Sequence, residues 1–246
     1  MVIEIAANSL LSALNAQEGG ASRIELCSDL ELGGITPSAG LIRKVRSALD
    51  IPVFVLIRPR SGDFIYSEFE FETMLADIEF CKMEGIDGIV TGFLDVNACI
   101  DKERLQLVQK AAGEMAVSFH RAFDLTGSAS DSLKILKECG IKRVLTSGQK
   151  SNAIEGRFMI RQLIEEAKNE IIIMPGSGVN ENNIIPLSEF TGAREFHTSS
   201  RIRIKSQMPH LNRDLLLSSN IEIPEHDYFI SDLQKIKKVV GSFAVG

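Results

Sequence analysis

Residues 113–124 read GEMAVSFHRAFD, in which a glycine precedes a short apolar run, residues 115–119, and three polar residues, His120, Arg121 and Asp124, follow it. A glycine in this place is typical of a helix C-cap, and an apolar run of this length is typical of a buried strand. Charged side chains that begin where a buried strand ends indicate either a functional site or a salt-bridged corner. The rest of the chain has to decide between these two interpretations.

The same pattern recurs along the whole chain. Eight short apolar or β-branched runs predict strands at residues 2–6, 23–27, 53–57, 88–91, 115–119, 143–146, 171–174 and 194–197. Between these runs apolar residues recur at helical spacing, and several of the helical stretches end in a glycine. Eight strand–helix units, with no GxGxxG motif after the first strand, favour a closed barrel over an open doubly wound sheet. We therefore expect an α/β fold, a single-domain TIM-type (β/α)8 barrel over residues 1–246, closed by a helix near residues 230–240.

Composition narrows the classes of function. The chain has 27 Lys and Arg against 33 Asp and Glu, a net charge of −6, which disfavours general electrostatic binding to a nucleic-acid backbone. The sequence lacks a signal-peptide pattern and a long apolar run, so we expect a soluble, cytoplasmic protein that does not bind membranes. The four cysteines are widely spaced and form no CxxC pair, which predicts reduced thiols rather than a zinc module or a disulfide framework.

In a barrel of this type the carboxyl ends of the strands share one face, so the polar residues there are expected to surround a common pocket. The candidates for anion or substrate binding are Arg58, Arg60, Arg121, Ser147, Gly148, Gly176, Ser177, Gly178 and His197. The candidates for acid or base catalysis are His120, Asp124, Glu25 and Glu4. The glycines at 176 and 178 follow the seventh strand, where barrels often bind phosphate through backbone N–H groups.

Each candidate also has a purely structural interpretation. The Gly176–Gly178 segment could be only a tight turn, and His120 could be a packed histidine held by Glu4 or Asp124. Glu4 and Glu25 lie within strands, so they could belong to a buried ion network that needs a partner such as Arg58. A further basic run is interpreted as a solvated loop, with gating of an anion as the alternative; its residues are Arg201, Arg203 and Lys205.

Six longer motifs resemble the CutC family of copper homeostasis proteins. They are RIELCSDLELGGITPS at 23–38, IRPRSGDF at 57–64, FHRAFD at 119–124, VLTSG at 144–148, MPGSGV at 174–179 and EFHTSSR at 195–201. The resemblance covers nearly the whole chain. It implies a TIM-barrel-like fold, a cytoplasmic location, a role in copper tolerance or handling, and assembly into a homo-oligomer.

The resemblance also implies a copper site, for which this chain is poorly equipped. In some relatives two cysteines in the first two strands are proposed to bind copper; the second matches Cys27, whereas the first falls at Ala6. Cu(I) prefers soft thiolate and thioether ligands, so Cys27 would need His120, a methionine or a second subunit to complete a site.

Two hypotheses of function follow. The first is a copper homeostasis protein that binds or buffers the ion, with Cys27 as its candidate ligand. The second is a barrel enzyme acting on a small anionic, perhaps phosphorylated, metabolite, with an indirect effect on copper; its reaction cannot be assigned from the sequence. A Schiff-base mechanism is disfavoured because Lys150, the nearest candidate to a strand end, lies in a loop two residues beyond Gly148.

Overall fold

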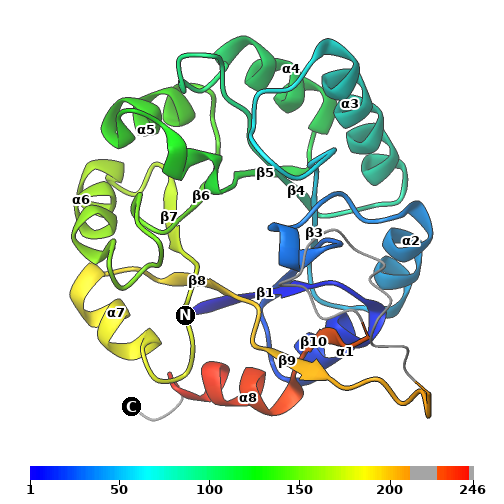
Figure 1. Cartoon of the computed structure of the whole chain (residues 1–246). Helices are drawn as coiled ribbons and strands as arrows, with labels where there is room; N and C mark the ends of the chain where they lie inside the picture. Colours follow the sequence, from blue (N-terminus) through cyan, green and yellow to red (C-terminus); the bar gives the residue numbers. More distant parts are fainter. Residues whose placement is uncertain (211–225, 244–246) are drawn as a thin grey trace.

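A ring of parallel strands surrounded by helices forms the molecule (Figure 1). The computed structural model describes residues 1–210 and 226–243. The barrel strands are β1 Val2–Ala7, β2 Arg23–Leu26, β3 Val53–Leu56, β4 Gly88–Thr91, β5 Ala116–Phe119, β6 Arg143–Thr146, β7 Ile172–Pro175 and β8 Glu195–Thr198. They pair in the order β7-β6-β5-β4-β3-β2-β1-β8, and β7 lies beside β8, so the barrel is nearly closed.

Helices follow the strands and cover the outside of the ring (Figure 1). They are α1 Leu10–Glu18, α2 Ala39–Ala48, α3 Glu68–Met83, α4 Lys102–Ala112, α5 Ala129–Glu138, α6 Arg157–Ala167, α7 Ile184–Thr191 and α8 Leu233–Gly241. Two short 3-10 helices, η1 Leu30–Leu32 and η2 Arg121–Leu125, lie in the loops after β2 and β5. The predicted barrel is confirmed, and each strand lies within one residue of its predicted limits.

Side-chain alternation along the strands creates two different interiors. On β1, Ile3, Ile5 and Ala7 belong to the large apolar core, whereas Glu4 and Ala6 alternate with them. A second, smaller apolar cluster consists of Cys27, directly after β2, Phe54 and Leu56 on β3, and Val90 on β4. The large apolar core packs the helices against the outside of the barrel, and the smaller cluster forms one wall of the barrel interior.

The C-terminal part differs from expectation in one respect. Residues 201–205 are not simply a solvated loop, because Arg201–Ile204 form a strand, β9, that pairs antiparallel with β10, Tyr228–Ser231. Arg203 pairs with Asp227, which neutralises it, and the predicted closing helix begins at Leu233. Among the described residues, no helix combines the length and the apolar character needed to cross a membrane.

Candidate active site at the carboxyl ends of the strands

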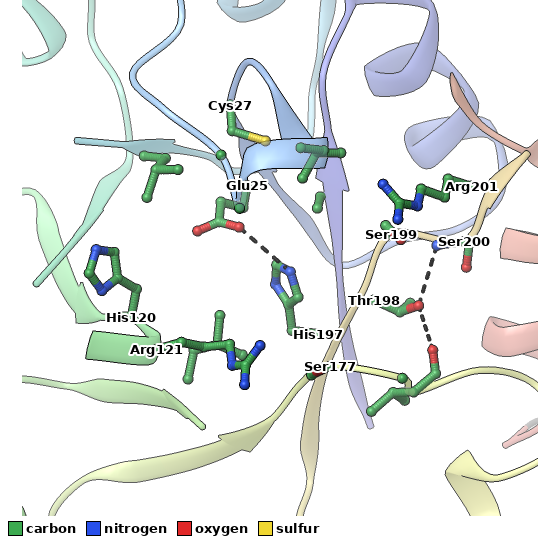
Figure 2. Close-up of a pocket in the computed structure, with 18 of the residues that line it drawn as sticks. Glu25, Cys27, His120, Arg121, Ser177, His197, Thr198, Ser199, Ser200 and Arg201 are labelled. Atoms are coloured by element: carbon green, nitrogen blue, oxygen red, sulfur yellow. Dashed lines mark hydrogen bonds and ion pairs between the residues drawn. The ribbon is translucent and has the colours of Figure 1, made fainter. Parts of the chain in front are cut away.

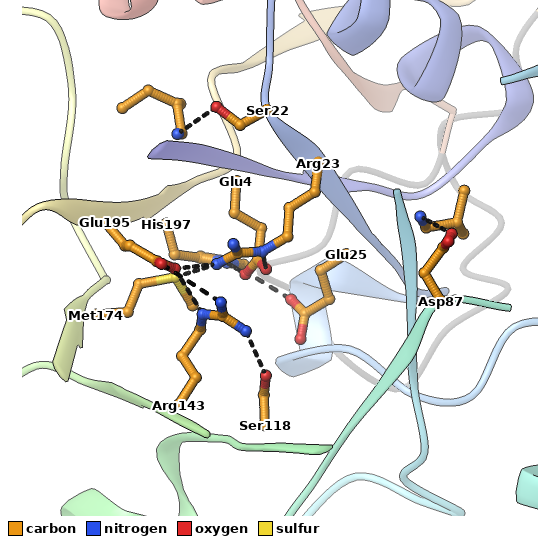
Figure 3. A network of polar contacts seen from close by, with 12 residues as sticks. Glu4, Ser22, Arg23, Glu25, Asp87, Ser118, Arg143, Met174, Glu195 and His197 are labelled. Atoms are coloured by element: carbon orange, nitrogen blue, oxygen red, sulfur yellow. Dashed lines mark hydrogen bonds and ion pairs between the residues drawn. The ribbon is translucent and has the colours of Figure 1, made fainter. Parts of the chain in front are cut away.

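A buried ion network fills the barrel at the amino-terminal ends of its strands (Figure 3). Arg23, the first residue of β2, donates from Nε to Glu4 at 2.5 Å and from a terminal nitrogen to Glu195 at 2.7 Å. Arg143, the first residue of β6, donates from Nε to the same Glu195 carboxylate at 2.6 Å. Both guanidinium groups also lie over the ring of Phe54. Two cations and two anions are therefore matched within the barrel.

The expected partner of the buried carboxylates was wrong. Arg58 donates to backbone carbonyl oxygens of Leu32, Gly34 and Gly62, and its guanidinium lies 4.9 Å from the centre of the Phe64 ring. It therefore shapes the loops after β2 and β3. Arg23, at the start of a strand, is the cation that pairs with Glu4.

Beyond this network a cavity of about 520 Å³ opens at the carboxyl ends of the strands (Figure 2). This volume suits a small-molecule ligand. Its polar lining includes Glu25, His120, Arg121, Ser177, Gly178, His197, Thr198, Ser199, Ser200 and Arg201, and its apolar lining includes Ala6, Cys27, Leu30, Leu56, Phe64 and Leu145.

His197 lies between two carboxylates. Its Nδ1 is 2.8 Å from Glu4 Oε1, and its Nε2 is 3.6 Å from Glu25 Oε2. Burial alone would raise the pKa of Glu4, but Arg23 and His197 lower it to about 2. Burial raises the pKa of Glu25 to about 7, against the opposing charge of His197. Burial would lower the pKa of His197, yet the charges of Glu25 and Glu4, together with the hydrogen bond to Glu4, raise it.

These three side chains also place potential metal-binding atoms within 4.8 Å of one another. Carboxylate oxygen and imidazole suit a harder divalent cation better than Cu(I). Arg23 already pairs with Glu4, which reduces the negative charge that this cluster can offer to a cation.

His120 is held as a neutral hydrogen-bond donor. The ring is 6% exposed, and its Nδ1 accepts a hydrogen bond from the backbone N–H of Ala122, which places the proton on Nε2. This buried Nε2 has no partner among the described residues. Burial, and secondly the charge of Arg58, lower the pKa of His120 to about 3. The expected salt bridge of His120 to Glu4 or Asp124 does not form.

Asp124 is fully engaged in holding a loop. Its carboxylate accepts hydrogen bonds from Thr146 Oγ1, from the backbone N–H groups of Ser147 and Gln149, and from Arg121 Nε. It does not line the cavity. The structure therefore gives this candidate acid or base a structural role, which is to fix Arg121 and the loop after β6.

The anion-binding candidates divide into two groups. Ser177 and Gly178 line the cavity with left-handed φ angles of 71° and 76°, and their backbone N–H groups have no acceptor among the described residues. Gly176 donates to Thr146 O, and a Cβ there would lie 2.4 Å from Leu145. Four candidates lie outside the cavity lining: Gly176; Arg60, which pairs with Glu70 and Asp63; Ser147, which binds Asp124; and Gly148, which packs on Gly156.

Cys27 lies on the cavity wall, to which Ala6 also belongs, and is fully buried. Its thiol donates to Ala7 O at 3.8 Å, and burial raises its pKa well above the usual value. The other three thiols lie on the outer helices or loops, and Cys27 is the one that lines this cavity. A Cu(I) ion at Cys27 would therefore find a single soft ligand from this wall.

Several lining residues were not singled out from the sequence. Ser199 and Ser200 follow His197 at two and three residues' distance, so the motif that contains all three was a signal that could have found them. Lys235, in the first turn of α8, reaches the cavity rim and donates to Arg201 O. No local pattern connects such a distant residue with the strand ends.

Comparison with known proteins places these features in a family. The model of the CutC family matches residues 1–202. A human protein named copper homeostasis protein cutC homolog is 42% identical over 236 residues, which cover 96% of this chain and 86% of that protein. A family protein CutC from Parabacteroides distasonis is 42% identical, with coverage of 97% and 99%. The crystal structure of the putative copper homeostasis protein CutC from Streptococcus agalactiae superposes with a TM-score of 0.78 at 33% identity, covering 81% of this chain and 98% of that one.

Proposed function

This chain belongs to the CutC family, and from that premise we propose that it takes part in copper homeostasis, in the cytoplasm, by binding a small anionic metabolite. The names of its relatives support the part in copper homeostasis. The cavity supports the metabolite, because its volume and its mixed apolar and polar lining are those of a small-molecule site.

One observation carries the preference for an anion. The N–H groups of Ser177 and Gly178 have no acceptor in the described part of the chain. Both residues line the cavity together with Arg121 and Arg201, whose ion-pair partners are Asp124 and Glu31. Free backbone donors beside cations are the usual means by which barrels bind phosphate after their seventh and eighth strands. The effect on copper would then follow indirectly from the metabolite.

Inorganic phosphate tests this proposal. We expect millimolar phosphate to raise the melting temperature by about 3 °C at a concentration ten times the Kd, since binding to the folded state alone contributes about 1.4 kcal/mol. Arg201→Gln should weaken the effect, whereas Arg203→Gln should preserve it, because Arg201 lines the cavity and Arg203, two residues further along β9, does not. A melting temperature that phosphate leaves unchanged would refute the anion site.

Direct binding of Cu(I) is the second candidate, favoured by the place of Cys27 on the cavity wall. Titration of Cu(I) against a competing chelator should distinguish wild type from Cys27→Ala if this thiol is a ligand. The exposed Cys99 supplies the matched control, Cys99→Ala. Equal affinity in all three proteins, or no binding by any of them, would eliminate Cys27.

A further inference from the structure

We propose that the cavity catalyses proton transfer next to a carbonyl group, with His120 donating a hydrogen bond to the carbonyl oxygen and Glu25 removing and returning the proton. This inference rests on the proposed function, because it names the chemistry of the anionic metabolite. The substrate would be a small α-hydroxy aldehyde or ketone with an anionic group at its other end. Ser177 and Gly178 would bind that group.

The first support is the state of His120. A buried N–H without an acceptor costs about 1–3 kcal/mol, so a partner is expected from outside the described residues. The donor is His120 Nε2, which is buried and unpartnered on a residue that lines the cavity (Figure 2). The ring is fixed from two sides: Phe64 packs on it with centroids 4.8 Å apart, and Ala122 donates to Nδ1. A neutral imidazole in a fixed orientation can polarise a carbonyl without giving up its proton.

The second support is that Glu25, of the three buried glutamates inside the barrel, is the one without an arginine in an ion pair. Glu4 and Glu195 both pair with guanidinium groups, whereas the charged partner of Glu25 among the described residues is His197, at 3.6 Å. Glu25 lines the cavity, and Figure 2 shows it beside His197 and across from His120. Glu4 holds the far side of the imidazole at 2.8 Å and so positions the pair. A carboxylate in this setting is free to accept a proton from a ligand.

The reaction balances without any further reactant. Glu25 takes the proton from the carbon that bears the hydroxyl group, and the C–H electron pair forms the double bond of an enediolate. The carbonyl electrons move to the oxygen that His120 Nε2–H stabilises. The proton moves between the two oxygens, and Glu25 returns a proton to the former carbonyl carbon. No group leaves, and nothing is oxidised or reduced overall.

Hydrogen exchange measures this step directly. The probes are dihydroxyacetone phosphate, glyceraldehyde 3-phosphate and ribulose 5-phosphate, each incubated with the protein in D2O and followed by proton NMR. We expect deuterium to enter at the carbon next to the carbonyl of at least one probe faster than in buffer alone. Glu25→Gln should slow exchange about 10²–10⁴-fold, and His120→Phe, which retains the packing on Phe64, about 10²–10³-fold. Glu79→Gln on the exposed face of α3 should exchange at the wild-type rate.

The rise in melting temperature with inorganic phosphate distinguishes a failure of this inference from a failure of the proposed function on which it rests. Both active-site variants should retain the shift, which shows that they fold and keep the anion site. Wild-type protein that shows the shift but exchanges none of the three probes overturns the proton transfer and leaves the anion site standing. Exchange by Glu25→Gln at the wild-type rate also overturns it. So does a borohydride-trapped adduct between a probe and the protein, which would assign the chemistry to a lysine such as Lys235.

Discussion

Glu4 and Glu25 show how strongly position decides the behaviour of one residue type. The two side chains belong to neighbouring strands and approach the same imidazole, yet their pKa values differ, at about 2 and about 7. Both are buried, so burial cannot explain the difference. Arg23 does, because it forms an ion pair with Glu4 and leaves Glu25 without one. The sequence shows two glutamates in strands and gives no sign of which one has the arginine.

This difference predicts how Glu25→Gln changes stability with pH. The pKa of Glu25 rises from 4.5 to about 7 on folding, so the folded state holds more protons between these values and wild-type stability falls as pH rises through them. Glutamine does not titrate in this range, so the variant does not lose stability in this way as pH rises. Relative to wild type, the variant should gain about 1–3 kcal/mol in free energy of unfolding between about pH 4.5 and about pH 8. Urea denaturation at both pH values measures the gain; an equal difference at both would contradict the prediction.

Gly92 controls the place of His120. A Cβ at Gly92 would lie 2.4 Å from His120 Nδ1, so Gly92→Ala must displace the ring or the strand end. Overpacking of this kind costs about 1–3 kcal/mol, which should lower the melting temperature by about 3–10 °C. Gly127→Ala is the matched control, because a Cβ at Gly127 meets nothing within 4 Å. Equal melting temperatures for the two variants would mean that the ring moves aside at no cost.

Sequence patterns brought part of the candidate set to one cavity and predicted its pairing poorly. Glu25, His120, Arg121 and His197 were expected at the strand ends, and the structure brings all four to one cavity. The expected pairing through Arg58 was wrong, because hydrogen bonds to three loop carbonyls turn that side chain away. Which side chains form ion pairs depends on the register between the barrel strands, and the sequence of one strand does not determine that register.

At the scale of elements, alternation of apolar runs was sufficient to predict the barrel strands. Each run is buried on both faces, so its length and composition carry the signal. Strand β9 was missed because its burial alternates between exposed and half-buried, and its partner β10 lies beyond residue 226. A strand whose partner is distant in sequence leaves no local pattern of this strength.

The loop after β6 depends on a single carboxylate. Asp124 in η2 accepts hydrogen bonds from the backbone of Ser147 and Gln149 and pairs with Arg121 at 2.9 Å. Asp124→Ala leaves these donors unpaired and should lower the free energy of unfolding by about 3 kcal/mol. It should also weaken the phosphate-induced melting shift, because Arg121 loses its anchor. Asp63→Ala removes an exposed ion pair with Arg60 and should change neither quantity; similar losses in both variants would remove the special role of Asp124.

In the molecule as a whole, charged side chains fill part of the barrel interior. Barrels of this fold usually fill their interior with layers of branched apolar side chains. Here Arg23, Arg143, Glu4 and Glu195 form a charged layer in place of an apolar one (Figure 3), and the cavity lies beyond it towards the carboxyl ends. The layer supports the site because Glu4, one of its members, also holds His197. Stability and site geometry therefore share one set of contacts.

Such a layer should tolerate the loss of a matched pair better than the loss of one charge. Arg143→Met alone leaves Glu195 with one cation, and Glu195→Leu alone leaves Arg143 buried without an anion; each should cost about 3–5 kcal/mol in free energy of unfolding. The double variant keeps the balanced pair of Arg23 and Glu4, so it should cost less than the sum by about 1–3 kcal/mol. Urea denaturation of all four proteins gives this coupling energy. The exposed pair of Lys134 and Asp131 serves as the control cycle, and its coupling should be far smaller. If the double variant loses as much free energy of unfolding as the two single variants together, water reaches these charges and they do not act as one layer.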